Sequence, residues 1–207
     1  KILGMRLHNL GNLGAFPTGA GAAIPLEVGP KVSTSVYHIP AYYLVTDAYA
    51  THTAPLAAYR GAGRPEAVYL MERLMEKAAD ELGVDPIEMR RKNFIPVDAM
   101  PYTTPLGEVY DSGYFNTVLD LILEQADWNG FEVRKAESAE KGKLRGRGLS
   151  CYIEWTGAEW SEHVRMEASS AGKFTCYSGT QAMGQGIETA YLQLLSEKMD
   201  LPLDQLN

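Results

Sequence analysis

Two glycine-rich turns, each followed directly by an amphipathic segment, constrain this chain more than any other feature. The first covers residues 58–66 (AYRGAGRPE) and the second residues 179–186 (GTQAMGQG). Glycine lets backbone N–H groups approach a ligand closely, and the start of a helix adds unpaired donors with positive potential. Each turn is therefore either a binding site for an anion or an electron-rich ring, or a tight turn that holds no ligand.

The polar side chains of these turns favour a ligand. Arg60 and Arg64 would add fixed positive charge and forked donors to the first turn. Gln181 and Gln185 in the second turn can both donate and accept hydrogen bonds, which a heteroaromatic ring with alternating edges requires. Because one chain carries both turns, we expect them to face one bulky, phosphate-bearing cofactor.

Apolar spacing predicts four amphipathic helices. Residues 65–82 repeat apolar side chains every three or four positions and end at Gly83. Asp85 caps a second helix, residues 114–126 form a third, and the fourth begins near Ile187. The methionine-rich stripes are expected in the core rather than on a cofactor. The expected buried face of the fourth helix consists of Ala190, Tyr191, Leu194, Leu195 and Met199.

The remaining chain reads as irregular backbone and strands. Residues 10–29 are expected to be irregular and closely packed, and residues 35–49 to form a strand interrupted by Pro40. A further strand is expected at 149–155, and a hairpin over 163–178. This mixture predicts an α+β fold with largely antiparallel strands. The charged segment 132–147 offers the best internal boundary.

Composition excludes several classes of protein. A net charge of −7 over 207 residues, with scattered basic groups, argues against nucleic-acid binding. The densest basic run, residues 90–92, falls at a helix end, where cations complement the dipole. Cys151 and Cys176 are expected to be buried free thiols in a reducing compartment, and the histidines lack metal-ligand spacing. With no signal peptide and no apolar span, the expected location is the cytoplasm. The chain, which opens at Lys1 inside a strand-like run, reads as a segment of something longer.

The two turns also carry a family resemblance. Residues 58–67 (AYRGAGRPEA) resemble the A-[FY]-R-G-x-G-x-P-[QE] signature of the molybdenum hydroxylases, the xanthine dehydrogenase and aldehyde oxidase family, and MGQG at 183–186 resembles a second signature. The motifs ELGVDP, TPLGEVYDSG and KLRGRG fit the same family in order and spacing. The chain is most similar to bacterial large subunits of the carbon-monoxide-dehydrogenase-like type, over essentially its whole length.

The resemblance implies a molybdopterin-binding segment of two lobes, residues 1–145 ending the first and residues 146–207 starting the second. The cofactor is expected in its cytosine dinucleotide form. Its dithiolene holds the metal, so no side chain here need be a metal ligand. Cofactor-binding positions carried over from the family are Arg60, Gly61, Met183, Gly184, Gln185 and Gly186.

The resemblance also implies an activity and its partners. The family hydroxylates a carbon of an aldehyde or N-heterocycle with water as the oxygen source, and electrons leave through [2Fe-2S] clusters to FAD. These cofactors are expected on an iron–sulfur subunit and a flavin subunit. The glutamate that acts as catalytic base lies downstream of this segment, so the segment contains no catalytic residue and alone should be inactive.

The expected substrate pocket departs from the family pattern. Ala62 stands where xanthine dehydrogenases have a stacking phenylalanine, and the loop 61–63 lacks the cysteine that binds copper in carbon monoxide dehydrogenases. The stretch 154–160, with Glu154 and Trp155, aligns with part of the pocket wall. Its tryptophans either stack on a planar substrate or pack a loop.

Two other interpretations remain open at this point. The chain could be a non-catalytic assembly or scaffold module that keeps the fold without the cofactor. It could also be an unrelated enzyme binding a nucleotide phosphate at the two helix starts, although neither G-x-x-x-x-G-K-[ST] nor a strand–G-x-G-x-x-G–helix pattern is present.

Overall fold

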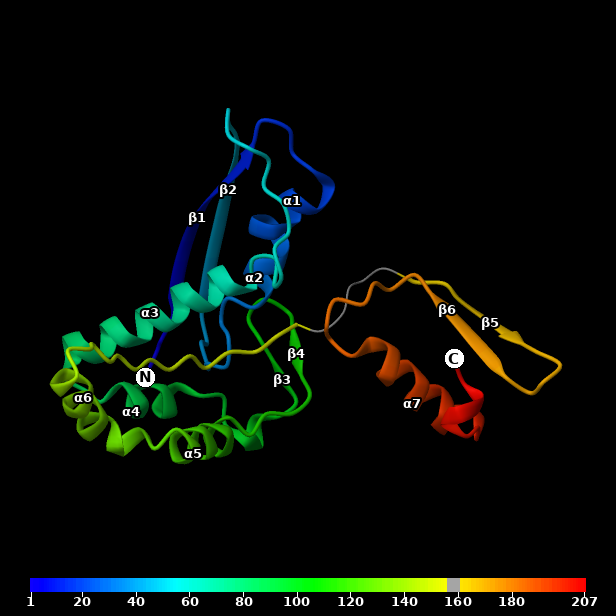
Figure 1. Ribbon diagram of the computed structural model, residues 1–207. Coiled ribbons are helices and arrows are strands. Elements are labelled where there is room, and N and C mark those ends of the chain that lie inside the picture. The colour runs from blue at the N-terminus through cyan, green and yellow to red at the C-terminus, as the bar shows by residue number, and fades with distance from the viewer. Residues whose placement is uncertain (156–160) are drawn as a thin grey trace. The chain divides into compact units, whose positions relative to one another are not determined.

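The computed structural model describes residues 1–155 and 161–207, which form two compact units, Lys1–Trp155 and Thr156–Asn207 (Figure 1). Unit 1 contains β1 (Met5–Gly14), α1 (Gly19–Ala23), the π-helical η1 (Ile24–Val28), α2 (Gly29–Lys31), β2 (Tyr42–Ala50), α3 (Arg64–Leu82), α4 (Pro86–Asn93), η2 (Val97–Ala99), β3 (Tyr102–Thr103), β4 (Val109–Tyr110), α5 (Phe115–Gln125), η3 (Trp128–Gly130) and α6 (Phe131–Glu140). Unit 2 contains β5 (Val164–Ala168), β6 (Phe174–Ser178), α7 (Ile187–Met199) and η4 (Leu203–Gln205). The α+β class is confirmed, whereas the assignment of two lobes that divide near residue 145 stays a prediction.

The longest strand pair is parallel. β1 and β2 run side by side (Figure 1), in register from Met5 opposite Tyr42 to Asn12 opposite Tyr49. A parallel pair needs a crossover connection, which α1, η1 and α2 supply beside the pair. The β3–β4 and β5–β6 pairs are antiparallel.

The irregular structure expected over residues 10–29 is wrong in detail. Residues 10–14 belong to β1, and residues 19–31 form short helical turns. The Thr18 side chain caps α1 by accepting a hydrogen bond from the Gly21 N–H. Pro25 and Pro30 each lie in the first turn of the next helix, where a missing N–H costs nothing. Some of the glycines and prolines that suggested loops are therefore helix-start residues, while Gly11 and Gly14 lie in β1.

The strand expected over residues 35–49 begins only at Tyr42. Residues 33–39 instead turn through the core, where Tyr37 and Ile39 are fully buried. The apolar residues between 33 and 39 are buried in a loop and not in a strand. A prediction from apolar residues alone therefore places the start of the strand too early.

The helices of unit 1 follow the apolar spacing. α3 buries Met71, Met75 and Ala79, which confirms the methionine stripe as core. Asp85 caps α4, because its carboxylate accepts from two N–H groups at 2.8 and 3.0 Å. The shared core joins residues from four segments, which are residues 36–39, α3, α4 with its C-terminal cap, and α5: Val36, Tyr37, Ile39, Met71, Met75, Ala79, Ile87, Met89, Phe94 and Leu119.

A buried ionic network crosses this core. Arg90 is 0% exposed and its Nε donates to Glu72 Oε2 at 3.0 Å, while a terminal nitrogen donates to Glu76 Oε1 at 2.7 Å. Glu72 also accepts from the Tyr37 hydroxyl at 2.5 Å and from the Cys151 N–H at 3.0 Å. Burial, followed by the charge of Glu72, raises the pKa of Tyr37. The basic run at 90–92 does lie at a helix end, but its first member holds the core together.

Residues 149–155 do not form the expected strand. Among the described residues their backbone bonds go to side chains, as when Cys151 O accepts from the Ser35 hydroxyl at 3.1 Å. Every second side chain of this segment is nevertheless directed inward, because Leu149, Cys151 and Ile153 pack against the core. An extended segment whose side chains alternate between the core and the opposite side has the sequence pattern of a β-strand, even when its backbone pairs with no other strand.

Cys151 is expected to react slowly with alkylating agents. Burial, and then the Glu72 carboxylate, raises the pKa of its thiol from 9.0 to about 11. A two-unit rise leaves about a hundredfold less thiolate at pH 8. Iodoacetamide labelling of the folded enzyme at pH 8, followed by mass spectrometry, should therefore be about a hundred times slower at Cys151 than in the urea-unfolded enzyme. Equal rates would contradict this burial. Because the folded pKa is raised, this thiol stabilises the fold fully below pH 9, and that contribution is lost as the pH rises through about 11.

Unit 2 is a hairpin with one helix. Val164 lies opposite Ser178 and Ala168 opposite Phe174, which confirms the predicted hairpin. The chain end bonds to β6, since Asn207 N donates to Phe174 O at 2.8 Å. The predicted buried face of α7 is wrong as a description of this unit, because Leu194 is 52% and Met199 39% exposed. One hairpin and one helix offer too little surface to cover that face.

No helix in the described parts of the chain is long and apolar enough to cross a membrane.

Candidate functional site

The first glycine-rich turn places three consecutive residues at positive φ. Gly61, Ala62 and Gly63 have φ values of 99°, 46° and 98°. Two backbone hydrogen bonds close the turn, from Ala62 N to Tyr59 O at 2.7 Å and from Arg64 N to Gly61 O at 3.1 Å. α3 begins immediately afterwards, with Gly63 as its N-terminal cap. The conformation of this turn is thus set by its backbone angles and hydrogen bonds, and no side chain of the described residues caps the start of α3.

Both glycines are required by close packing as well as by φ. A Cβ on Gly61 would lie 2.7 Å from Pro65 Cδ, and one on Gly63 would lie 2.8 Å from Ile24 O. The turn therefore packs directly against the helical segment after β1, which fixes its backbone.

Several donors of this turn are available to a ligand. Within the described residues, the N–H groups of Arg60, Gly61 and Gly63 donate to no acceptor. The Arg60 side chain is exposed and likewise has no ion-pair or hydrogen-bond partner in that part of the chain. Backbone donors beside a guanidinium at a helix start fit an anionic or oxygen-rich group.

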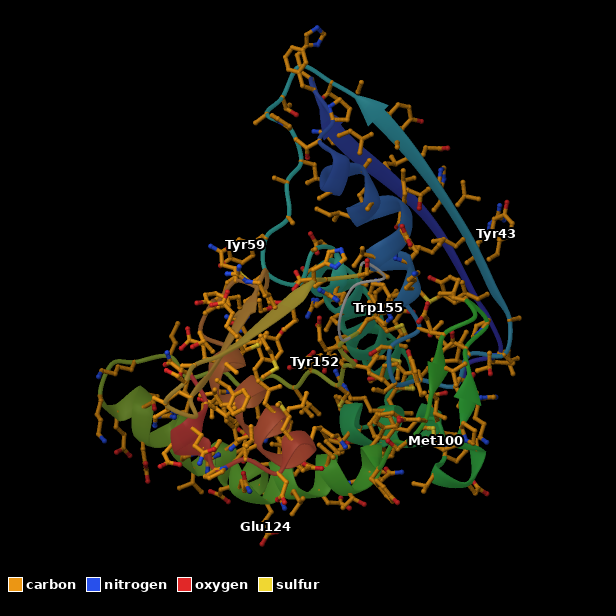
Figure 2. The ribbon with its side chains drawn as sticks, turned by 90° about the vertical axis from the view of Figure 1, so that its right-hand side faces the viewer. Tyr43, Tyr59, Met100, Glu124, Tyr152 and Trp155 are labelled. Atoms are coloured by element: carbon orange, nitrogen blue, oxygen red, sulfur yellow. The ribbon has the colours of Figure 1, made fainter. Side chains whose placement is uncertain are left out.

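Arg60 and Gly61 border a pocket of about 600 Å³. Its lining residues are Arg60, Gly61, Arg64, Pro65, Val68, Ser150, Tyr152 and Glu154. The structure therefore brings the predicted residues Arg60, Gly61 and Glu154 together, whereas Ala62 and Trp155 are not among the lining residues. Figure 2 shows Tyr59 at the entry to the turn, with Tyr152 and Trp155 on the segment that ends unit 1.

Arg64 joins the two sides of this pocket. Its Nε donates to Gly61 O at 2.7 Å and lies 2.8 Å from Glu154 Oε1. A terminal nitrogen donates to Trp155 O at 2.6 Å. The Arg64 side chain is 17% exposed, so this ion pair is shielded on one side, while the Glu154 side chain remains 50% exposed.

Trp155 is half-buried, and the ammonium group of Lys31 lies 4.4 Å from the centre of its ring. This contact fits the packing interpretation of the tryptophan, and stacking on a substrate stays a prediction. The rest of the expected pocket wall, residues 156–160 with Trp160, lies outside the described residues.

The second glycine-rich turn lies in unit 2. Gly184 and Gly186 have φ values of 87° and 74°, and nothing within 4 Å would meet an added Cβ. These glycines are therefore needed for φ alone. In the described parts of the chain, the N–H groups of Gly184, Gln185 and Gly186 donate to no acceptor.

The Gln185 side chain stabilises the second turn through hydrogen bonds to the backbone of the same turn. Its Oε1 accepts from Met183 N, and its Nε2 donates to Gln181 O at 2.9 Å. Direct hydrogen bonding to a cofactor would require this amide to exchange one of these partners. The Met183 side chain is 69% exposed and available for contact.

No group of three or more His, Cys, Asp or Glu side chains in the described residues is placed to hold a metal ion.

Several lining residues of the pocket are absent from the sequence-based site, and Arg64 and Tyr152 are the two with polar side chains that bear on the argument. The contact of Arg64 with Trp155 has no sequence signal, because the two residues lie 91 positions apart. Tyr152 does have one. Since Leu149, Cys151 and Ile153 pack inward, the alternate positions Ser150, Tyr152 and Glu154 share the pocket face.

Comparison with known proteins identifies the fold and the family. Two models, each described as a molybdopterin cofactor-binding domain, match residues 1–94 and 121–207. The chain is 30% identical to the nicotine 6-hydroxylase large subunit of Paenarthrobacter nicotinovorans, covering 100% of this chain and 27% of that protein. It is 31% identical to the carbon monoxide dehydrogenase large chain of Afipia carboxidovorans, covering 100% of this chain and 28% of that protein.

Solved structures agree. Quinoline 2-oxidoreductase from Pseudomonas putida 86 superposes with a TM-score of 0.85 at 28% identity, over 99% of this chain and 28% of that one. The chain thus spans between a quarter and a third of the length of these relatives. With its two glycine-rich turns and both domain matches, the chain belongs to the molybdopterin-binding large subunits of the molybdenum hydroxylase family.

Proposed function

We propose that this chain is the cofactor-binding segment of a cytoplasmic molybdenum hydroxylase. The enzyme oxidises a carbon of an N-heterocycle or aldehyde and takes the oxygen from water. The observation that carries this proposal is the Arg60 guanidinium together with the N–H groups of Arg60 and Gly61, all without an acceptor among the described residues. These donors border a pocket large enough for part of a cofactor or a small ring.

Each turn has a distinct task in this proposal. Arg60 and the Gly61 N–H stabilise negative charge on oxygen or sulfur atoms near the metal. Gly184, Gln185 and Gly186 would bind the pterin through their N–H groups and Met183 through its exposed side chain, and the Gln185 amide would join them by exchanging an internal partner. When bound, the molybdenum cofactor supplies the two-electron oxidation of the substrate carbon. The residues of this chain position the cofactor and the substrate, and the proton acceptor comes from outside it.

The finer form of the cofactor and the partner subunits are part of the same proposal. We propose the cytosine dinucleotide form, with [2Fe-2S] clusters and FAD on an iron–sulfur subunit and a flavin subunit. One relative, 28% identical over this whole chain, is named subunit gamma of a 6-hydroxypseudooxynicotine dehydrogenase complex, which supports a multi-subunit assembly.

The substrate is proposed to be a nitrogen heteroaromatic compound. The relatives named for nicotine and quinoline act on such rings. Ala62 is small where xanthine dehydrogenases carry a phenylalanine, and Glu154 lines the pocket beside the first turn. Copper-dependent oxidation of carbon monoxide is not proposed, because residues 61–63 contain no cysteine.

An isotope experiment tests this function. The purified complex containing this chain is incubated in H₂¹⁸O with ferricyanide and, separately, quinoline, nicotine, nicotinate or benzaldehyde. The reaction R–H + H₂O → R–OH + 2H⁺ + 2e⁻ predicts one ¹⁸O per product and two ferricyanide reduced. A complex that carries molybdenum but takes its oxygen from O₂ contradicts the proposal. A folded complex without molybdenum supports the non-catalytic module instead.

Replacing Trp155 by Ala is expected to change substrate preference without loss of molybdenum. Removing the ring takes away stacking area worth about 1 kcal/mol, or roughly a fivefold change in kcat/KM between planar and non-planar substrates. The ratio of kcat/KM for quinoline, which is planar, and cyclohexanecarbaldehyde, which is not, measures this effect. Trp128→Ala is the matched control, since Trp128 packs under Arg147 in the same unit. An unchanged ratio in Trp155→Ala would assign the ring to loop packing alone.

A further inference from the structure

We propose that Arg64 is a positioning residue that locks the substrate-side segment, residues 150–155, onto the cofactor-side turn, residues 60–63. This inference deepens the proposed function and rests on it. Arg64 differs from Arg60, the other arginine of the turn. Arg60 is exposed and has no partner within the described residues, whereas the hydrogen bonds and the ion pair of the Arg64 side chain in that part of the chain all go to these two segments.

The contacts of Arg64 reach both segments at once. On the turn, Nε donates to Gly61 O at 2.7 Å, the same carbonyl that closes the turn through Arg64 N at 3.1 Å. On the other segment, a terminal nitrogen donates to Trp155 O at 2.6 Å and Nε lies 2.8 Å from Glu154 Oε1. Only a planar, forked cation can serve acceptors on two sides in fixed geometry.

The position of Arg64 on the chain makes this lock stiff. Arg64 is the first residue of α3, and Pro65 follows it with a fixed φ. Gly63, just before it, packs against Ile24 and Gly29. The guanidinium therefore projects from a rigid base. A shift of the Trp155 carbonyl must be accompanied by a shift of the Gly61 carbonyl or by loss of a charge-assisted hydrogen bond.

Glu154 completes the arrangement by neutralising Arg64. With this pair formed, Arg60 is the one charged group of the pocket lining without a partner in the described residues. Arg60 and Arg64 thus have different roles. Arg64 fixes geometry and Arg60 remains available for an anionic group. A lysine at position 64 would keep the charge but could not hold Gly61 O and Trp155 O together.

The test compares Arg64→Lys with Arg73→Lys in the complete enzyme. Arg73 is an exposed arginine on the same helix that lies outside the pocket lining and has no ion pair within the described residues. Two readouts are taken. Hydrogen exchange is measured at the Ala62 and Arg64 amides, which the turn protects, and the Mo(V) electron paramagnetic resonance spectrum is recorded after partial reduction with dithionite.

The proposal predicts a changed Mo(V) spectrum and exchange at least about tenfold faster at these two amides in Arg64→Lys, with molybdenum content unchanged. Arg73→Lys should match the unmodified enzyme in all three. Exchange that stays the same in Arg64→Lys overturns the proposal. So does faster exchange with an unaltered spectrum, since the lock would then not reach the cofactor. If the unmodified enzyme holds no molybdenum, the proposed function fails, and the exchange comparison alone decides whether Arg64 holds the turn.

Discussion

Replacing Arg90 by Met is expected to destabilise unit 1 more than any other single change of a charged residue described above. The substitution would leave Glu72 buried, at 6% exposure, without its opposite charge. Breaking a buried pair in this way costs about 3–5 kcal/mol. For a domain of this size the unfolding midpoint should fall by roughly 6 to 20 °C. Calorimetry of the complete enzyme, with proteolysis of unit 1 as a second probe, measures the effect.

The neighbouring residue provides the control for Arg90→Met. Arg91 contacts Glu88 and Asp120 at the surface, and its side chain is 26% exposed. Surface pairs contribute at most about 1 kcal/mol, so Arg91→Met should shift the midpoint by no more than about 4 °C. Equal shifts for the two variants would show that the Arg90–Glu72 network is not what holds the segments of unit 1 together.

Replacing Gly63 by Ala is expected to disrupt the first turn and remove most of the bound molybdenum. The residue has a φ of 98°, and its new Cβ would lie 2.8 Å from Ile24 O and 3.1 Å from Gly29 N, both backbone atoms. Strain and overpacking together cost about 2–4 kcal/mol. Since 1.4 kcal/mol is a factor of ten, molybdenum per chain, measured by mass spectrometry of the metal, should fall at least about tenfold.

Gly83→Ala separates backbone strain from this clash. Gly83 also has positive φ, at 62°, but nothing lies within 4 Å of an added Cβ. It ends α3 far along the chain from the turn, so its replacement should cost about 1 kcal/mol and leave molybdenum content unchanged. Loss of molybdenum in Gly83→Ala, or full retention in Gly63→Ala, would contradict the role assigned to the turn.

The sequence predicts those parts of the fold in which local periodicity and packing agree. α3, α4 and α5 follow from apolar spacing with Asp85 and Gly83 as end signals, and the hairpin follows from its alternation and turn. In residues 19–31 the same glycines and prolines suit either loops or short helices. The choice there depends on packing beside β1 and β2, which local sequence does not contain.

The candidate site likewise contains residues that local sequence predicts and contacts that it does not. Arg60 and Gly61, which the structure places on one pocket, could be chosen as candidates because their chemistry is concentrated in one continuous motif. The ion pair of Arg64 with Glu154 and the burial of Arg90 depend on residues brought together from distant segments. A run of basic residues at a helix end looks the same whether it is solvated or, as at Arg90, enclosed by two carboxylates. Long-range electrostatic partners are thus the part of this site that spacing does not reveal.

Metal analysis of the native complex tests the central claim most directly. The complex containing this chain is purified from cells supplied with molybdate, and molybdenum, iron and copper are measured per chain. The account predicts molybdenum stoichiometric with the chain, iron from the partner subunit and no copper. A well-folded complex that contains no molybdenum would contradict it and identify the chain as a module that keeps the fold without the cofactor.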